Sequence, residues 1–136
     1  MAQHDPAKAV KTALADFFDA EESSITVTLE VPDDYTPVDG EPLLLVADDG
    51  GDQVNPGAWM AGKGLLRITL RLTAFARGRT ESRAVIDAAI DQLRATRPAE
   101  LARIENFPAV LDTRDRETGA YLASITMPCL VKPPVA

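Results

Sequence analysis

One stretch of the sequence has the spacing of a phosphate-binding loop. Residues 57–64 read Gly-Ala-Trp-Met-Ala-Gly-Lys-Gly, which satisfies the G-x-x-x-x-G-K part of that loop. The context argues against nucleotide binding, because Gly64 stands where Ser or Thr should bind magnesium and a strand pattern follows where a helix should begin. We therefore expect a flexible loop here and no nucleotide cofactor.

Three neighbouring aspartates, Asp48, Asp49 and Asp52, raise the question of a calcium site. An EF-hand loop needs oxygen ligands at alternate positions and a glutamate at the twelfth, but the twelfth residue from Asp48 is Trp59. The spacing therefore favours a solvated turn, and we expect no bound metal.

Nucleophilic chemistry has few candidates. His4 is the only histidine and Cys129 the only cysteine, which excludes an intrachain disulfide and zinc sites built from several such residues, and fits a reducing compartment. Cys129 lies in a strand pattern and is expected to be a small buried residue. The 21 Asp and Glu residues could supply paired carboxylates, but no spacing selects a pair. We predict no catalytic residue, and an enzyme is the weaker class of function.

The strongest pattern lies in residues 65–77, where every second residue is apolar, as in a long strand with one buried face. The opposite face carries Arg67, Arg71 and Arg77, with threonines between them. Two interpretations stay open. The arginines are solvated charges, or they bind an acidic neighbouring copy, because arginine pairs with carboxylates through two hydrogen bonds.

Other patterns complete the elements. Asp5 as N-cap and Pro6 at the first helical position begin an amphipathic helix, and Pro128 puts the last strand at a sheet edge because proline cannot donate to a ladder. The expected elements are helices 6–20 and 80–95, strands 25–31, 42–47, 65–77 and 120–131, a helical turn near 99–104, a short strand near 109–111, a hairpin loop at 112–119 and a loose tail at 132–136.

This order, α-β-β-β-α-(β)-β, predicts an α+β fold. A strand that leads directly into a helix is typical of two-layer domains. We expect one domain of residues 1–136, with two helices packed on one antiparallel or mixed β-sheet.

The segment 48–64 is predicted to be a long loop, because it holds five glycines and three aspartates. Loops of more than about 12–15 residues in compact domains are usually functional or disordered, so this is the best candidate for a binding segment. Trp59 and Met60 would anchor an interface if they are exposed. Alternatively, Trp59 folds back onto the core of its own chain.

The net charge limits the classes of partner that the chain is expected to bind. The chain has 136 residues, a formal charge of −7 and a pI near 4.6, which argues against general affinity for nucleic-acid phosphates. The hydrophobic content of 46% is that of a globular protein. The first residues lack a signal-peptide pattern and no apolar run approaches about 20 residues. We expect a product made in the cytoplasm, without a membrane partner.

The sequence as a whole resembles the tail terminator proteins of long-tailed bacteriophages. The resemblance runs from about Ala7 to Val131, in the order of elements and in several stretches. These are Pro-Leu-Leu-Leu-Val-Ala-Asp-Asp-Gly-Gly, Leu-Arg-Ile-Thr-Leu-Arg-Leu-Thr-Ala-Phe-Ala-Arg-Gly-Arg, Ala-Val-Ile-Asp-Ala-Ala-Ile-Asp-Gln-Leu and Arg-Asp-Arg-Glu-Thr-Gly before the closing strand.

The resemblance implies a virion protein at the junction of head and tail, without an active site. Such a subunit forms a hexameric ring on the last ring of the tail tube, ends tube polymerisation and presents a surface to the head connector. DNA would pass through its lumen without specific binding. The interface residues expected on this interpretation are Arg67, Arg71, Arg77, Trp59, Met60, Asp48, Asp49 and Asp52.

Two alternatives from other classes stay open. Another head-to-tail joining (neck) protein would share the ring, although its helices need not be placed in the same way. A non-viral small α+β binding or regulatory domain would more often be a dimer, because two-fold symmetry is the commonest in oligomers.

Overall fold

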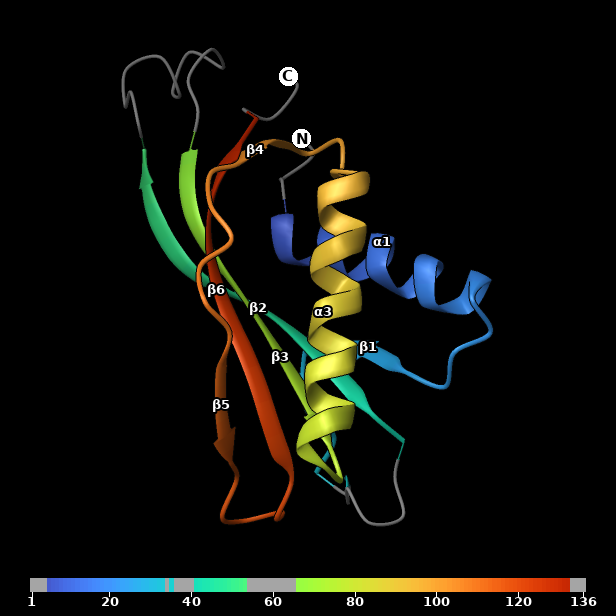
Figure 1. Cartoon of the computed structure of the whole chain (residues 1–136). Helices are drawn as coiled ribbons and strands as arrows, with labels where there is room; N and C mark the ends of the chain where they lie inside the picture. The colour runs from blue at the N-terminus through green and yellow to red at the C-terminus, as the bar shows by residue number, and fades with distance from the viewer. Residues whose placement is uncertain (1–4, 34, 36–40, 54–65, 133–136) are drawn as a thin grey trace.

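A computed structural model describes residues 5–33, 35, 41–53 and 66–132 (Figure 1). The predicted α+β class is confirmed, because two helices lie against one mixed sheet of six strands. The elements are α1 (Pro6–Ala20), β1 (Thr26–Thr28), β2 (Leu43–Gln53), β3 (Leu66–Ala76), α3 (Arg79–Ala95), β4 (Leu101–Ile104), β5 (Leu111–Arg114) and β6 (Tyr121–Val131).

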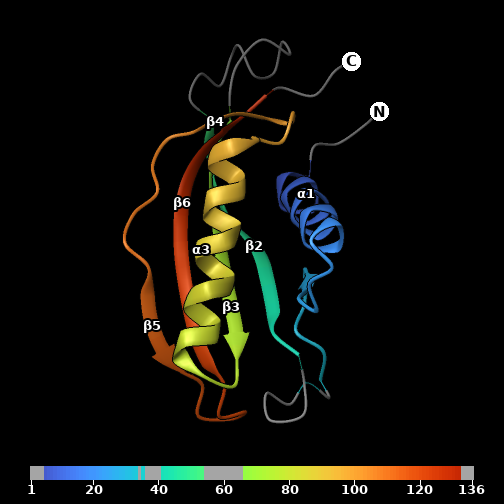
Figure 2. The ribbon, with the colours of Figure 1, turned by 45° about the vertical axis from the view of Figure 1, so that its right-hand side comes forward.

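The sheet is built around β3 and β6, which pair antiparallel over eleven residues from Leu66↔Val131 to Ala76↔Tyr121. On one side of this pair β3 binds β2, and β2 binds β1 in parallel. On the other side β4 and β5 share the edge of β6, so the order is β1-β2-β3-β6-β4 with β5 also on β6. Figure 2 shows β3 and β6 behind α3, with β5 beside β6.

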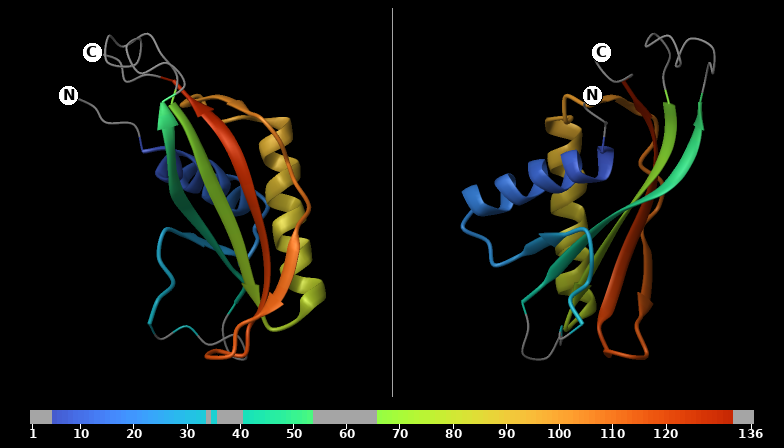
Figure 3. Two further views of the ribbon diagram at one scale, coloured as in Figure 1. Left: turned by 90° about the vertical axis from the view of Figure 1, so that its left-hand side faces the viewer. Right: turned by 180° about the vertical axis from the view of Figure 1, so that it is seen from behind.

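Both helices cover the same face of the sheet, and the main core lies between them. The left panel of Figure 3 shows the sheet in front and α1 and α3 behind it. The alternate residues predicted to be buried on the long strand face the helices from Ile68 to Ala76. The largest fully buried side chains are Leu14, Leu44, Leu70, Leu72, Ile86, Leu93, Leu101, Ile125, Met127, Val10, Val46 and Val131.

The first helix has the bounds predicted from the sequence, and both of its ends have a local cause. The Asp5 carboxylate accepts a hydrogen bond of 3.0 Å from the Lys8 N–H, and Pro6 occupies the first turn. At the other end Ser23 N–H donates to Phe18 O at 2.9 Å, and Glu22 N–H to Asp19 O at 3.1 Å. This is a Schellman motif in which Glu22, with a φ of 56°, takes the left-handed position usually held by glycine.

The prediction of a loop at 48–64 is wrong for its first part. β2 continues to Gln53, because β3 is long enough to pair with it beyond Ala47. A register irregularity between Asp48 and Gly51 accommodates the glycine-rich sequence. The remainder of the predicted loop, 54–64, and the predicted tail after Lys132 lie outside the described residues.

The first strand is shorter than predicted. The alternation in 25–31 gave a seven-residue strand, but only Thr26–Thr28 pair, opposite Leu43–Leu45. The hydroxyl of Thr28 then accepts from Glu30 N–H at 3.2 Å and donates to Glu30 O at 2.7 Å, which turns the chain away from β2.

The predictions between the second helix and the last strand also need correction. Instead of a helical turn near 99–104, the chain forms β4, because these residues can pair with the end of β6. The short strand is β5, which begins at Leu111 and takes in three residues of the predicted hairpin loop, so that the turn begins at Asp115. Gly119, with a φ of +77°, provides the left-handed residue of this turn.

Pro128 does not mark an edge strand, contrary to the prediction, because β6 lies between β3 and the β4–β5 edge. Its carbonyl accepts the Glu105 N–H at 2.8 Å, so its nitrogen also faces that side of β6. On this side of β6, Ser124 is the last residue that pairs with β5 before Pro128, and Cys129 is the first that pairs with β4. The missing N–H of Pro128 therefore falls in the gap between these two strands.

Candidate interaction surface

The sheet face turned away from the helices is the candidate interaction surface, and we call it the open face. It is formed by the residues of β2, β3 and β6 that alternate with the core residues. Among the described residues no helix covers it. Its charged and polar side chains are Asp49, Arg67, Thr69, Arg71, Thr73, Ser124 and Thr126.

Arg67 forms the closest ion pair of this face, with Glu105 just after β4. Arg67 Nε lies 2.7 Å from Glu105 Oε1 and Nη2 lies 3.3 Å from Oε2, which is a two-point contact across β6. The hydrogen bond and the charge of Glu105 raise the pKa of Arg67, and the hydrogen bond from Arg67 lowers the pKa of Glu105. The pair holds the start of the 105–110 connection against the open face.

Arg71 lies on the same face of β3, four residues after Arg67 and with Thr69 between them. Its Nη2 lies 3.2 Å from Asp49 Oδ1, and the two side chains are 48% and 37% exposed. Such an exposed pair contributes little to stability. Two charges of opposite sign are therefore presented together on the surface.

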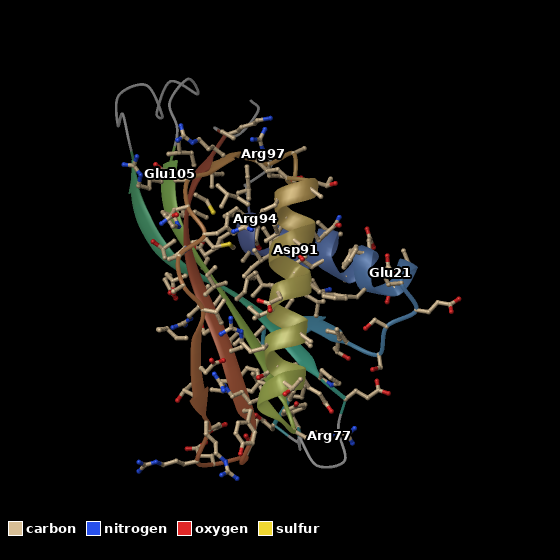
Figure 4. All side chains as sticks on the ribbon, viewed as in Figure 1. Glu21, Arg77, Asp91, Arg94, Arg97 and Glu105 are labelled. Atoms are coloured by element: carbon tan, nitrogen blue, oxygen red, sulfur yellow. The ribbon has the colours of Figure 1, made fainter. Side chains whose placement is uncertain are left out.

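Arg77 is not brought together with the other two arginines. It follows the C-terminal end of β3, where its Nε lies 2.9 Å from Glu81 Oε1 in the first turn of α3. Figure 4 shows Arg77 and Glu105 at opposite ends of the molecule. The predicted row of three arginines thus reduces to Arg67 and Arg71.

The acidic residues predicted for the interface belong to β2 rather than to a turn. Asp48 is exposed and pairs in register with Leu70, and the Cα of Asp52 lies opposite Arg67. Trp59 and Met60, with the phosphate-loop motif, lie outside the described residues. No group of three or more His, Cys, Asp or Glu within the described ranges could hold a metal ion.

The opposite end of the open face is apolar, which the sequence did not indicate. Leu43, Phe75 and Ala120 form a second small cluster, and Tyr35 packs edge-on against Phe75 with ring centroids 6.1 Å apart. Burial raises the pKa of Tyr35, with a smaller contribution from Glu81. Beside this cluster Leu111 of β5 is 71% exposed. The sequence signal that could have identified this apolar end is an apolar residue at an outward position of a short edge strand.

A shallow hollow of about 380 Å³ lies between α3 and the segment after β4. Asp87, Asp91 and Arg94 line it from the helix, and the Arg94 guanidinium lies 4.8 Å from the centre of the Phe107 ring. Figure 4 shows Asp91 and Arg94 on the side of α3 that faces this segment. Arg94 remains exposed in this contact, so the hollow presents one cation and two carboxylates to solvent.

Cys129 is buried in the core, as expected from the strand pattern. Burial, with smaller contributions from the charges of Glu105 and Asp48, raises the pKa of its thiol to about 12. The thiol is protonated at neutral pH and does not act as a nucleophile in this state.

No protein-family model matches the sequence, and no curated protein is significantly similar to it. In the described part of the chain, neither helix combines the length and the apolar character needed to cross a bilayer.

Proposed function

We propose that this protein is a structural virion subunit that works by binding copies of itself and the end of a phage tail tube. In this role it caps the tube as a ring, ends tube polymerisation and joins the tail to the head connector. The proposal rests on the resemblance to tail terminator proteins and on one structural observation, the open face.

The open face supports binding to another protein for two reasons. Its upper half presents the Arg67–Glu105 and Arg71–Asp49 pairs, whose remaining hydrogen-bonding capacity faces solvent. Its lower half presents Leu111, which is 71% exposed, and the partly buried Leu45 and Leu122. An apolar area beside a polar, charged area is typical of protein interfaces.

The length of β2 and β3 supports the proposed contact with a neighbour or tube. Asp48 pairs with core residue Leu70, yet it is exposed, so β2, unlike β3, extends beyond the cover of the helices at this level. Figure 1 shows the upper part of β2 diverging from α1 and α3. A sheet that projects from its own core can reach a second subunit.

The proposal is tested by mixing the purified protein with polymerising tail tube protein encoded beside it. We expect rings by electron microscopy, labelled protein only at tube ends, and shorter tubes as its concentration rises. The double variant Arg67→Glu/Arg71→Glu should lose tube-end binding. Arg77→Glu is the matched control, because it also breaks an exposed arginine–carboxylate pair but lies at the other end of β3.

Three results would contradict the proposal. Tubes that grow to the same length with and without the protein would exclude a capping role. A two-fold dimer that ignores tubes would favour a small binding or regulatory domain, and rings that bind only the head connector would favour another neck protein.

A further inference from the structure

The charges of the chain are divided between the two sides of the sheet. Residues 5–33, 35 and 41–53, which form α1, β1 and β2, hold eleven Asp or Glu and two Lys, a formal charge of −9. Residues 66–132, which form the rest of the described fold, hold eight Asp or Glu and eleven Arg or Lys, a formal charge of +3. We call the first set the acidic flank. Because α1 packs on β1 and β2, and these two strands end the sheet on one side, this charge lies on that side of the molecule, with Asp48, Asp49 and Asp52 in β2 itself.

The acidic flank includes a length of strand edge beside which no described strand lies. β1 pairs only with Leu43–Leu45, so the ladder on the outer side of β2 ends there among the described residues. The Pro42 carbonyl points to this edge, because it accepts Thr26 N–H at 3.1 Å. Every second residue of a strand presents its N–H and C=O to the same side. The upper part of β2 therefore offers an edge to another strand on either side of the irregularity between Asp48 and Gly51.

The opposite side of the sheet has a second open edge, the outer edge of β4. No described strand pairs with it. Three exposed cations lie around it beside the exposed carboxylate of Glu100, since Arg97 follows α3, Arg103 lies in β4 and Lys132 follows β6. Lys132 N–H donates to Glu100 O at 3.1 Å, which holds the end of β6 beside β4. We call these three residues the cationic corner, and Figure 4 shows Arg97 near the end of α3.

The cations of this corner are available to a partner. None of the three forms an ion pair with a carboxylate of the described residues. The charge of Arg103 acts on nearby Glu105, but that carboxylate is already bound by Arg67 at 2.7 Å. The acidic flank supplies the complementary charge.

The two open edges lie at the same level of the sheet. Through the strand registers, Leu101 of β4 corresponds to Val131, then to Leu66 and then to Gln53 of β2. Ile104 corresponds in the same way to Gly51. β2 and β4 also run in opposite directions, so a second copy placed beside the first would set β4 antiparallel to β2 at the same level, although each strand has a register irregularity, between Asp48 and Gly51 in β2 and between Leu101 and Arg103 in β4.

We propose that a second copy of this chain binds here, with the β2 edge and acidic flank of one copy against the β4 edge and cationic corner of the next. The inference rests on the proposed function for the existence of a ring, and names the two surfaces that would build it. The contact is head to tail, so it leaves one free edge of each kind and continues into a ring or a filament.

The charges argue against the symmetric alternative. Pairing β2 with β2 around a two-fold axis would bring two flanks of −9 together, and like charges across an interface oppose association. Pairing β4 with β4 around a two-fold axis is opposed in the same way, because it would bring two cationic corners together. The head-to-tail contact is the arrangement in which each edge meets the opposite sign.

A charge-swap experiment tests the contact by analytical ultracentrifugation. One variant carries Asp48→Lys/Asp52→Lys and the other Arg97→Glu/Arg103→Glu. Each alone should associate at least about tenfold more weakly than the wild-type chain, because like charges then meet. A mixture of the two variants should recover association, because each reversed edge meets its reversed partner. The control is Arg114→Glu/Arg116→Glu, which reverses two exposed arginines at the β5–β6 turn and should leave association unchanged.

Three results would overturn the inference. These are a wild-type chain that stays monomeric at the highest soluble concentration, a control as impaired as the edge variants, and a mixture that does not recover. Circular dichroism spectra and melting curves confirm that the variants are folded. Monomers that still bound tube ends would overturn this contact and leave the proposed function standing, and rings formed by these edges that ignored the tube would do the reverse.

Discussion

Glu22 shows how one backbone position can cost stability. Its φ of 56° is the left-handed conformation, in which a Cβ is strained, and its carboxylate stands near the negative end of the α1 dipole. We expect Glu22→Gly to raise the free energy of unfolding by about 1 kcal/mol, measured by urea denaturation. Glu22→Ala removes the same charge but keeps the Cβ, so an equal gain in both variants would contradict the backbone explanation.

The buried thiol of Cys129 predicts a loss of stability in alkali. Its pKa is raised to about 12 in the folded chain, whereas an unfolded cysteine ionises at about 8.5. The unfolded state therefore releases its proton first, so the contribution of the thiol is complete below about pH 8.5 and declines as the pH rises towards 12.

The expected loss is about 2 kcal/mol at about pH 10, measured as the difference between wild type and Cys129→Ala in urea unfolding. The variant lacks the thiol but keeps the other groups that titrate in this range. Identical pH dependence of the two proteins would show that the thiol also ionises in the folded chain.

At the scale of elements, β3 and β5 contain leucines with opposite roles. Leu72 is 0% exposed between the sheet and the helices, and Leu111 is 71% exposed at the edge. We expect Leu72→Ala to lower the free energy of unfolding by about 3 kcal/mol, and Leu111→Ala to change it by less than about 0.5 kcal/mol, in chemical denaturation. A large loss at Leu111 would mean that it packs within its own subunit.

The elements predicted well are those whose pattern repeats several times within a short stretch. Helix 6–20 has a cap, a proline and a continuous apolar stripe, and strand 65–77 alternates along its whole length, so local sequence decides both. β4 has four residues and too few repeats to be recognised, and its pairing depends on β6, about thirty residues later. The continuation of β2 beyond Ala47 could not be recognised from local sequence either, because pairing with β3 makes a glycine-rich sequence extended there.

The candidate site was predictable only in part, for the same reason. Alternation identified the outward face of Arg67 and Arg71. It could not identify their partners, because Arg67 pairs with Glu105, 38 residues later, and Arg71 pairs with Asp49 on the neighbouring strand β2. Arg77 has the right alternation but lies beyond the end of the strand, where α3 begins. The class of fold followed from the order of elements, whereas the parallel pairing of β1 with β2 did not.

At the scale of the whole molecule, the division of charge predicts that self-association depends on salt. An attraction between the acidic flank and the cationic corner is screened at about 1 M NaCl, where the Debye length is about 3 Å. We expect association measured by light scattering to weaken markedly between about 0.05 M and 1 M NaCl. Association that strengthened with salt would indicate instead an apolar contact through the end of the open face around Leu111.

The pairing of β3 with β6 has a mechanical consequence. A force pulling β2 and β4 apart acts along the backbone hydrogen bonds, which lie perpendicular to antiparallel strands. A load that enters near Leu66↔Val131, at one end of this ladder, would open its eleven residue pairs one after another from that end. Tension around a closed circle of subunits would still part the shorter seams between neighbours first, because they hold fewer residue pairs than the middle of each sheet.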